Sequence, residues 1–122
     1  MLKVLVVDDD PDICLITRRL LTTLGCDSYE AKNGIDAEVA VKEINPDLVL
    51  LDIMMPIQDG YETCRHIRGM GYSGSIIMIS AMHEHTEAVK TQAAGANAYI
   101  QKPITRSVIQ FHIDHLMARL KP

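Results

Sequence analysis

Residues 45–56 read "NPDLVLLDIMMP", and this stretch decides the fold. Its apolar run, Leu48 to Leu51, is continuous rather than alternating, which is typical of a strand that is covered on both faces of a parallel sheet. The run ends in a carboxylate, Asp52, and Pro56 follows four positions later. An acidic residue at the end of a buried strand needs a reason, because a carboxylate is costly to bury without a partner.

Four more segments have the composition of strands. Residues 2–7 and 75–80 are again continuous and apolar, whereas residues 27–31 and 97–101 are shorter and more polar, as strands near a sheet edge are. Segments of helical period follow the five strands, over residues 11–24, 34–44, 60–68, 85–95 and 105–120. This alternation predicts an α/β fold of the doubly wound, flavodoxin-like type, with five parallel strands in the order 2-1-3-4-5 and five helices.

The composition is that of an ordinary globular protein. The chain has 122 residues, of which 48% are hydrophobic and 23% charged, so we expect one domain over residues 1–122. The net charge is −4 and no basic run is present, which argues against direct nucleic-acid binding. No apolar run is long enough for a membrane span, and "MLKVLVVDDD" is not a signal peptide, so we expect a cytoplasmic protein.

Polar and charged residues stand at the end of each central strand. Asp8 and Asp9 follow the first strand, Asp52 ends the third, Ser80 ends the fourth, and Lys102 follows the fifth. In a sheet of this order the ligand crevice lies outside the carboxyl ends of strands 1 and 3. We therefore expect these residues, from four separate segments, to converge on one rim.

The acidic residues at this rim indicate a metal ion. Asp10 and Asp12 are explained by capping of the helix that follows them, but Asp8 and Asp9 are not. Placed beside Asp52 they would repel one another, which either raises a pKa or requires a cation. A hard divalent ion with oxygen ligands, Mg²⁺ above all, would resolve the repulsion.

Other metal sites are less consistent with the sequence. The run "DDDPD" begins like a calcium EF-hand, but the sixth position is Ile13 instead of glycine and the twelfth is Arg19 instead of glutamate. His83 and His85 have no third ligand at a suitable spacing, so we expect solvated loop histidines. The three cysteines, Cys14, Cys26 and Cys64, are odd in number and have no CxxC spacing, which favours a packing role for them.

Lys102 and Ser80 each have an ordinary explanation, as a surface lysine and as a polar strand terminator. Pro103 favours a functional role for Lys102, because a Lys-Pro step directly after a strand can adopt a cis bond and aim the lysine over the sheet. The ammonium would then serve as a point charge for a phosphate or a carboxylate.

Four motifs carry a family resemblance: "VLVVDDDPDI", "PDLVLLDIMMPIQDGYE", "IIMISA" and "GANAYIQKPI". In this order and at these spacings, the chain resembles the receiver domain of bacterial two-component response regulators from Leu2 to Arg119, with a chemotaxis-regulator-like fold. The resemblance implies a signalling switch in which Asp52 accepts a phosphoryl group from a histidine kinase or phosphotransfer protein. Such a domain catalyses only its own phosphorylation and dephosphorylation.

The resemblance also implies a role for each of the other rim residues. Asp9 would bind Mg²⁺ directly, Asp8 would hold it through water, and Asp52 and the backbone carbonyl of Met54 would complete the protein ligands. The Ser80 hydroxyl and the Lys102 ammonium would contact the phosphoryl oxygens. Ser80 would then move and Tyr99 would turn inward, which reshapes the face made by the fourth helix, fifth strand and fifth helix. These other roles fall on the residues Asp8, Asp9, Met54, Ser80, Tyr99 and Lys102.

The last helix presents an apolar residue on its outer face. Its spacing predicts a buried stripe of Ile109, Ile113, Leu116 and Leu120, and at about 100° per residue Phe111 points nearly opposite. This position suggests a homodimer or partner contact at Phe111, and a singly exposed aromatic remains the alternative.

Three other functions are alternatives to the phosphoacceptor. An aspartyl-phosphate phosphatase carries a second aspartate where this chain has Met54, and a flavin mononucleotide carrier would have its phosphate repelled by "DDDPD". A receiver-like module that binds partners without phosphorylation remains the main alternative. The sequence fits either a stand-alone regulator or part of a longer chain.

Overall fold

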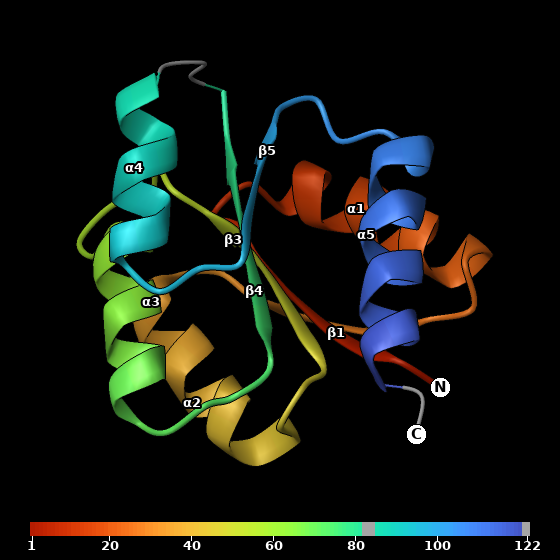
Figure 1. Ribbon diagram of the computed structural model, residues 1–122, viewed down its shortest axis with the longest axis horizontal. Coiled ribbons are helices and arrows are strands. Elements are labelled where there is room, and N and C mark those ends of the chain that lie inside the picture. Colours follow the sequence, from red (N-terminus) through yellow and green to blue (C-terminus); the bar gives the residue numbers. More distant parts are fainter. Residues whose placement is uncertain (82–84, 121–122) are drawn as a thin grey trace.

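The computed structural model describes residues 1–81 and 85–120, in which strands and helices alternate along the chain (Figure 1). The strands are β1 (Lys3–Val7), β2 (Asp27–Ala31), β3 (Leu48–Asp52), β4 (Ser75–Ser80) and β5 (Ala98–Gln101). The helices are α1 (Pro11–Thr23), α2 (Gly34–Ile44), α3 (Gly60–Gly69), α4 (His85–Ala93) and α5 (Arg106–Leu120). All neighbouring strands pair in parallel in the order β2-β1-β3-β4-β5, which confirms the predicted fold.

The central strands are apolar throughout because both faces of the sheet are covered. Figure 1 shows α1 and α5 on one side of the sheet and α2, α3 and α4 on the other. Alternate residues of β3 belong to different cores: Val49 and Leu51 pack with α2 and α3, whereas Leu48 and Leu50 pack with α1 and α5. A strand between two helical layers has no polar face, which explains the continuous run in this stretch.

Side-chain caps begin the first three helices. The Asp10 carboxylate accepts the N–H of Asp12 at 2.9 Å and starts α1, as the sequence predicted. Asn33 and Asp59 are the corresponding N-caps of α2 and α3.

The three cysteines are buried and free, and burial raises the pKa of each thiol, that of Cys14 to about 11. None of the helices within the described residues has the length and apolar character needed to cross a bilayer.

Helices α1 and α5 are less deeply covered than their sequences predicted. Helical spacing predicts an apolar stripe on α1 made of Ile13, Ile16, Leu20, Leu21 and Leu24. Of these residues only Leu21 is fully buried, and Ile16 is 56% exposed. In α5 the expected stripe holds for Ile109, Ile113 and Leu116, which are buried. The prediction is wrong for the last residue, Leu120, which is 56% exposed. A helix residue at the very end of its element can extend past the sheet, and periodicity alone does not show where the sheet stops.

The connection from β3 to α3 depends on a glycine. Gly60 donates its N–H to the carbonyl of Ile53 at 2.8 Å, and a Cβ at this position would lie 2.5 Å from the carbonyl oxygen of Asp52. We expect Gly60→Ala to lower the free energy of unfolding by about 2 kcal/mol, because backbone atoms would have to move. Urea denaturation measures the change.

Gly69, in the same helix, is the matched control for this substitution. A Cβ there would meet nothing within 4 Å, so Gly69→Ala should raise the free energy of unfolding by about 0.5 kcal/mol through helix propensity. Equal effects of the two substitutions would contradict the close-approach explanation.

Candidate functional site

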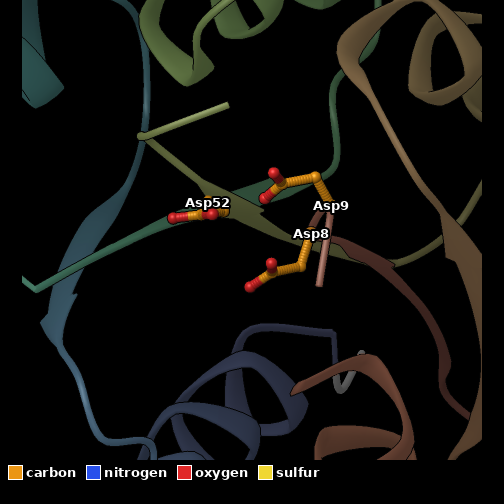
Figure 2. A group of neighbouring side chains, drawn as sticks. All are labelled: Asp8, Asp9 and Asp52. Atoms are coloured by element: carbon orange, nitrogen blue, oxygen red, sulfur yellow. The ribbon is translucent and has the colours of Figure 1, made fainter. Parts of the chain in front are cut away.

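Three carboxylates meet at the edge where the strands end. Asp8 follows β1 directly, Asp9 is the next residue, and Asp52 is the last residue of β3. Since β1 and β3 are parallel neighbours, their carboxyl ends lie side by side. One oxygen from each carboxylate lies within 4.8 Å of the others, and Figure 2 shows the three side chains grouped there. The structure thus brings together the acidic residues that the sequence placed at this rim.

Asp52 lies in the least hydrated part of this group. Its side chain is only 4% exposed, and burial raises its pKa to about 6, with a further increase from the nearby Asp8 carboxylate. The Lys102 ammonium and a backbone hydrogen bond from Met54 act in the opposite direction and lower this pKa. Oδ1 of Asp52 is buried and accepts no well-aligned hydrogen bond from the described residues. It is a carboxylate oxygen with room for an additional partner.

Lys102 supplies positive charge to the rim. Its Nζ lies 3.3 Å from Asp52 Oδ1 and 3.4 Å from Asp8 Oδ2, so one ammonium bridges two carboxylates. Burial by itself would lower the pKa of Lys102, but these carboxylates outweigh it and raise the pKa above its usual value. The Lys102–Pro103 peptide bond is cis. The lysine is therefore a charged part of the site and not a solvated surface residue.

The remaining predicted residues lie on β4 and β5. Ser80 ends β4 and is fully buried, and its carbonyl accepts the backbone N–H of Lys102 at 2.7 Å, which fixes the two residues on one rim. Tyr99 is partly buried on β5 and packs against the core on the α2 and α3 side of the sheet. His83 and the side chain of His85 lie outside the described residues.

The rim fits a hard divalent cation. Three carboxylates face one ammonium, which leaves an excess of negative charge when all four groups are ionised. Among the described residues the buried Oδ1 of Asp52 accepts no well-aligned hydrogen bond, although the Lys102 ammonium lies 3.3 Å away. The grouped side-chain oxygens of Asp8, Asp9 and Asp52 are carboxylate oxygens, the type that Mg²⁺ prefers. Asp8, Asp9 and Asp52 are the side chains that would hold such an ion.

Comparison with known proteins agrees with this geometry. A family model described as the response regulator receiver domain matches residues 4–114. The chain belongs to the response regulator receiver family. Response regulator MprA of Mycobacterium tuberculosis (strain ATCC 25177 / H37Ra) is 35% identical to this receiver domain over 120 residues, which are 98% of this chain and 52% of the relative. The chain therefore spans about half the length of the curated relatives that it matches.

Solved structures support the same assignment of the fold. The receiver domain of a Francisella response regulator has a TM-score of 0.91 at 26% identity and covers 99% of this chain and 100% of its own. A two-component response regulator from Clostridium difficile has a TM-score of 0.92 at 22% identity over 100% of both chains, which shows the fold alone. The resemblance inferred from the four sequence motifs is confirmed at the level of family and fold.

Sequence reasoning missed one polar group beside the site. Gln58, in the loop between β3 and α3, is only 6% exposed, and its side-chain amide contacts both α2 and α3. The one signal in the sequence was an amide residue after the mostly apolar stretch "IMMPI", before the N-cap Asp59. That signal did not reveal a partner, because Glu38 lies twenty positions earlier in the chain.

Proposed function

We propose that this receiver domain is a phosphoacceptor switch in which Asp52 receives a phosphoryl group from a histidine kinase or phosphotransfer protein. The observation that carries the proposal is the position of Asp52: a buried carboxylate that is paired with the Lys102 ammonium at 3.3 Å and lies next to two further carboxylates. A purely structural ion pair would not leave excess negative charge at a rim. A site that binds a cation together with a phosphoryl group would use this excess negative charge to hold the cation.

Asp52 acts as the nucleophile in this proposal. An oxygen of its carboxylate attacks phosphorus, the bond from phosphorus to the donor nitrogen breaks, and an acyl phosphate forms on Asp52. Because its pKa is about 6, the carboxylate is mostly ionised at pH 7 and able to attack. The Lys102 ammonium then contacts the transferred phosphoryl oxygens and stabilises the negative charge that develops on them during transfer.

Asp8, Asp9 and Asp52, with the Met54 carbonyl, are the residues we propose to hold Mg²⁺. The bound ion would neutralise charge on the phosphoryl oxygens during transfer. Asp8 and Asp9 contribute by fixing the ion at the rim, where their oxygens already lie close to those of Asp52. The same two carboxylates would repel a phosphoryl group if no cation were present, which makes the reaction dependent on the metal.

An apolar hollow beside Lys102 suits the phosphoryl donor. The hollow has a volume of about 330 Å³ and is lined by Ile13 and Ile16 of α1 and by Pro103 and Ile104 beyond β5. Ile16 is 56% exposed, so α1 carries more apolar surface than the sheet covers. We propose that the donor protein covers this surface, which lies next to Lys102, while it presents its phosphoryl group to Asp52.

The output surface is proposed to involve Ser80, Tyr99 and Phe111. Attraction of the Ser80 hydroxyl to a phosphoryl group and a turn of Tyr99 would reshape the face of α4, β5 and α5. Phe111 is 60% exposed, as its position in α5 predicted, and stacks on the ring of His115 at 5.7 Å. We propose this aromatic pair as a contact for a second copy or a downstream protein.

The absence of direct nucleic-acid contacts and the cytoplasmic location remain predictions.

Intact-mass measurement tests the proposed function. The protein is incubated with acetyl phosphate and Mg²⁺, and in parallel with acetyl phosphate and EDTA. We expect a mass gain of one phosphoryl group with Mg²⁺, assigned to Asp52 by peptide mapping, and almost no gain with EDTA because the excess negative charge repels the donor. A folded protein that gains no mass with Mg²⁺ would instead be a receiver-like module that binds partners without phosphorylation.

A further inference from the structure

The loop after Asp52 contains a strained turn. The backbone N–H of Gln58 donates to the carbonyl of Pro56 at 2.8 Å, which closes a three-residue γ-turn around Ile57. Ile57 has a φ of +72°, a conformation that is unfavourable for a β-branched residue. Its side chain is 94% exposed and packs against very little. Such a conformation is strained and persists only where neighbouring contacts hold it.

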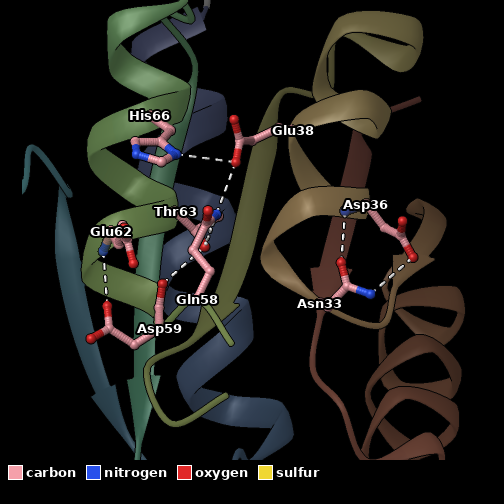
Figure 3. A network of polar contacts seen from close by, with 8 residues as sticks. All are labelled: Asn33, Asp36, Glu38, Gln58, Asp59, Glu62, Thr63 and His66. Atoms are coloured by element: carbon pink, nitrogen blue, oxygen red, sulfur yellow. Dashed lines mark hydrogen bonds and ion pairs between the residues drawn. The ribbon is translucent and has the colours of Figure 1, made fainter. Parts of the chain in front are cut away.

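Gln58 provides contacts that hold this turn. Its Nε2 donates to Glu38 Oε2 of α2 at 2.8 Å and to Thr63 Oγ1 of α3 at 2.9 Å (Figure 3). The Thr63 hydroxyl donates in turn to the carbonyl of Asp59, at the start of α3, at 2.9 Å. Both hydrogens of the Gln58 amide therefore have acceptors, one on each helix.

The surroundings of Gln58 are shaped to hold its side chain. At Gly34, the first residue of α2, a Cβ would lie 2.6 Å from Gln58 Nε2 and would also clash with the Thr63 hydroxyl. The Glu38 carboxylate that accepts from Gln58 also meets His66 Nδ1 of α3 at 3.2 Å. The amide thus fills a space between two helices and bonds to a carboxylate that itself links them.

We propose that Gln58 is a positioning residue of the phosphoacceptor site: its amide ties the strained turn after Asp52 to α2 and α3 and so fixes Met54. This inference rests on the phosphoacceptor function proposed above. Met54 lies between Asp52 and the turn, and its backbone donates a hydrogen bond to the Asp52 carboxylate. Loss of the amide contacts would let this backbone shift, and the orientation of Asp52 and the Met54 carbonyl would become less defined.

Gln58→Glu is the sharpest test, because it places a second carboxylate against Glu38. We expect the rate of phosphoryl uptake from acetyl phosphate to fall about ten-fold, and the Mg²⁺ concentration for half-maximal rate to rise by a similar factor, as is common for residues that support metal ligands. The exchange of the two residues, Glu38→Gln with Gln58→Glu, restores an amide beside a carboxylate and should recover most of both losses. Rescue of this kind identifies a specific pair.

Two further variants separate positioning from stability. Gln58→Met keeps the volume without adding charge and should show the same two kinetic changes, whereas Asp36→Asn, on α2 and bonded only to its cap Asn33 in Figure 3, should show neither. The melting temperature of every variant is measured, and rates are compared where each is folded. If both substitutions of Gln58 lower the melting temperature but leave the rate and the Mg²⁺ dependence unchanged, the positioning role is overturned.

Amide hydrogen exchange over residues 53–59 decides the inference independently of phosphorylation. Faster exchange in Gln58→Met than in wild type, with no change in Asp36→Asn, supports the role of the amide in holding the turn. Unchanged exchange in Gln58→Met overturns it. A wild-type protein that takes up no phosphoryl group would instead refute the proposed function, and the exchange result would still be informative about the turn.

Discussion

Asp52→Asn is expected to remove phosphoryl uptake from acetyl phosphate completely while the protein stays folded. The substitution keeps the size and shape of the side chain but replaces the nucleophilic carboxylate oxygen with an amide. We expect no uptake at the neighbouring carboxylates, Asp8 and Asp9, in this variant. Intact mass with Mg²⁺ present measures the loss.

Asp59→Asn is the matched control for this variant. Asp59 lies in the same loop, but its carboxylate only caps α3 by accepting the N–H of Glu62 at 2.9 Å, and asparagine caps a helix equally well. We expect uptake to be unchanged in this protein. Uptake in Asp52→Asn equal to that of wild type would place the phosphoryl group elsewhere and would refute the proposed acceptor.

Asp52→Asn should also change the stability of the protein in the absence of divalent metal. The pKa of Asp52 is raised from 3.8 to about 6 in the folded protein, so the folded state binds its proton more tightly than the unfolded state does. The stability that this proton confers is fully present below pH 3.8 and is lost as the pH rises through about 6. With EDTA present, Asp52→Asn should therefore be more stable than wild type above pH 6, and the difference should shrink as the pH falls toward 4.

The fold could be predicted from the sequence because its signals are local and redundant. The continuous runs at residues 48–51 and 75–80 identify strands covered on both faces, and Asp10 followed by Pro11 marks the start of a helix. Parallel strands joined by helices then allow few arrangements, so the positions of Asp8 and Asp52 at neighbouring strand ends follow from topology. The cluster of carboxylates was predictable for that reason.

Other features depend on tertiary contacts that the sequence pattern does not encode. The pairing of Gln58 with Glu38 requires knowledge of how α2 and α3 approach each other, and Ile57 gives no local sign that its φ is positive. Leu120 is exposed at the last position of α5, and Ile16 is exposed beside the hollow that Pro103 and Ile104 also line. Apolar periodicity therefore overestimated the core, and the excess lies partly on the surface that we propose for the phosphoryl donor.

Lys102→Met is expected to lower the rate of phosphoryl uptake about 100-fold, the loss typical of removing one group that stabilises developing negative charge. Methionine retains much of the apolar stem but leaves Asp8 and Asp52 without their common counter-ion. Because the ammonium lowers the pKa of Asp52, its loss should raise that pKa above about 6 and reduce the ionised fraction at neutral pH.

The pH dependence of the rate separates these two effects of Lys102. If the loss came only from protonation of Asp52, the rate of Lys102→Met would recover fully at higher pH. We expect partial recovery, because the ammonium also stabilises negative charge on the phosphoryl oxygens. Lys102→Arg, which keeps the charge, should lose less activity, and Lys42→Met, at an exposed position of α2, should lose none. A wild-type rate in Lys102→Met across the pH range would show that the ammonium is only a structural counter-ion for Asp8 and Asp52.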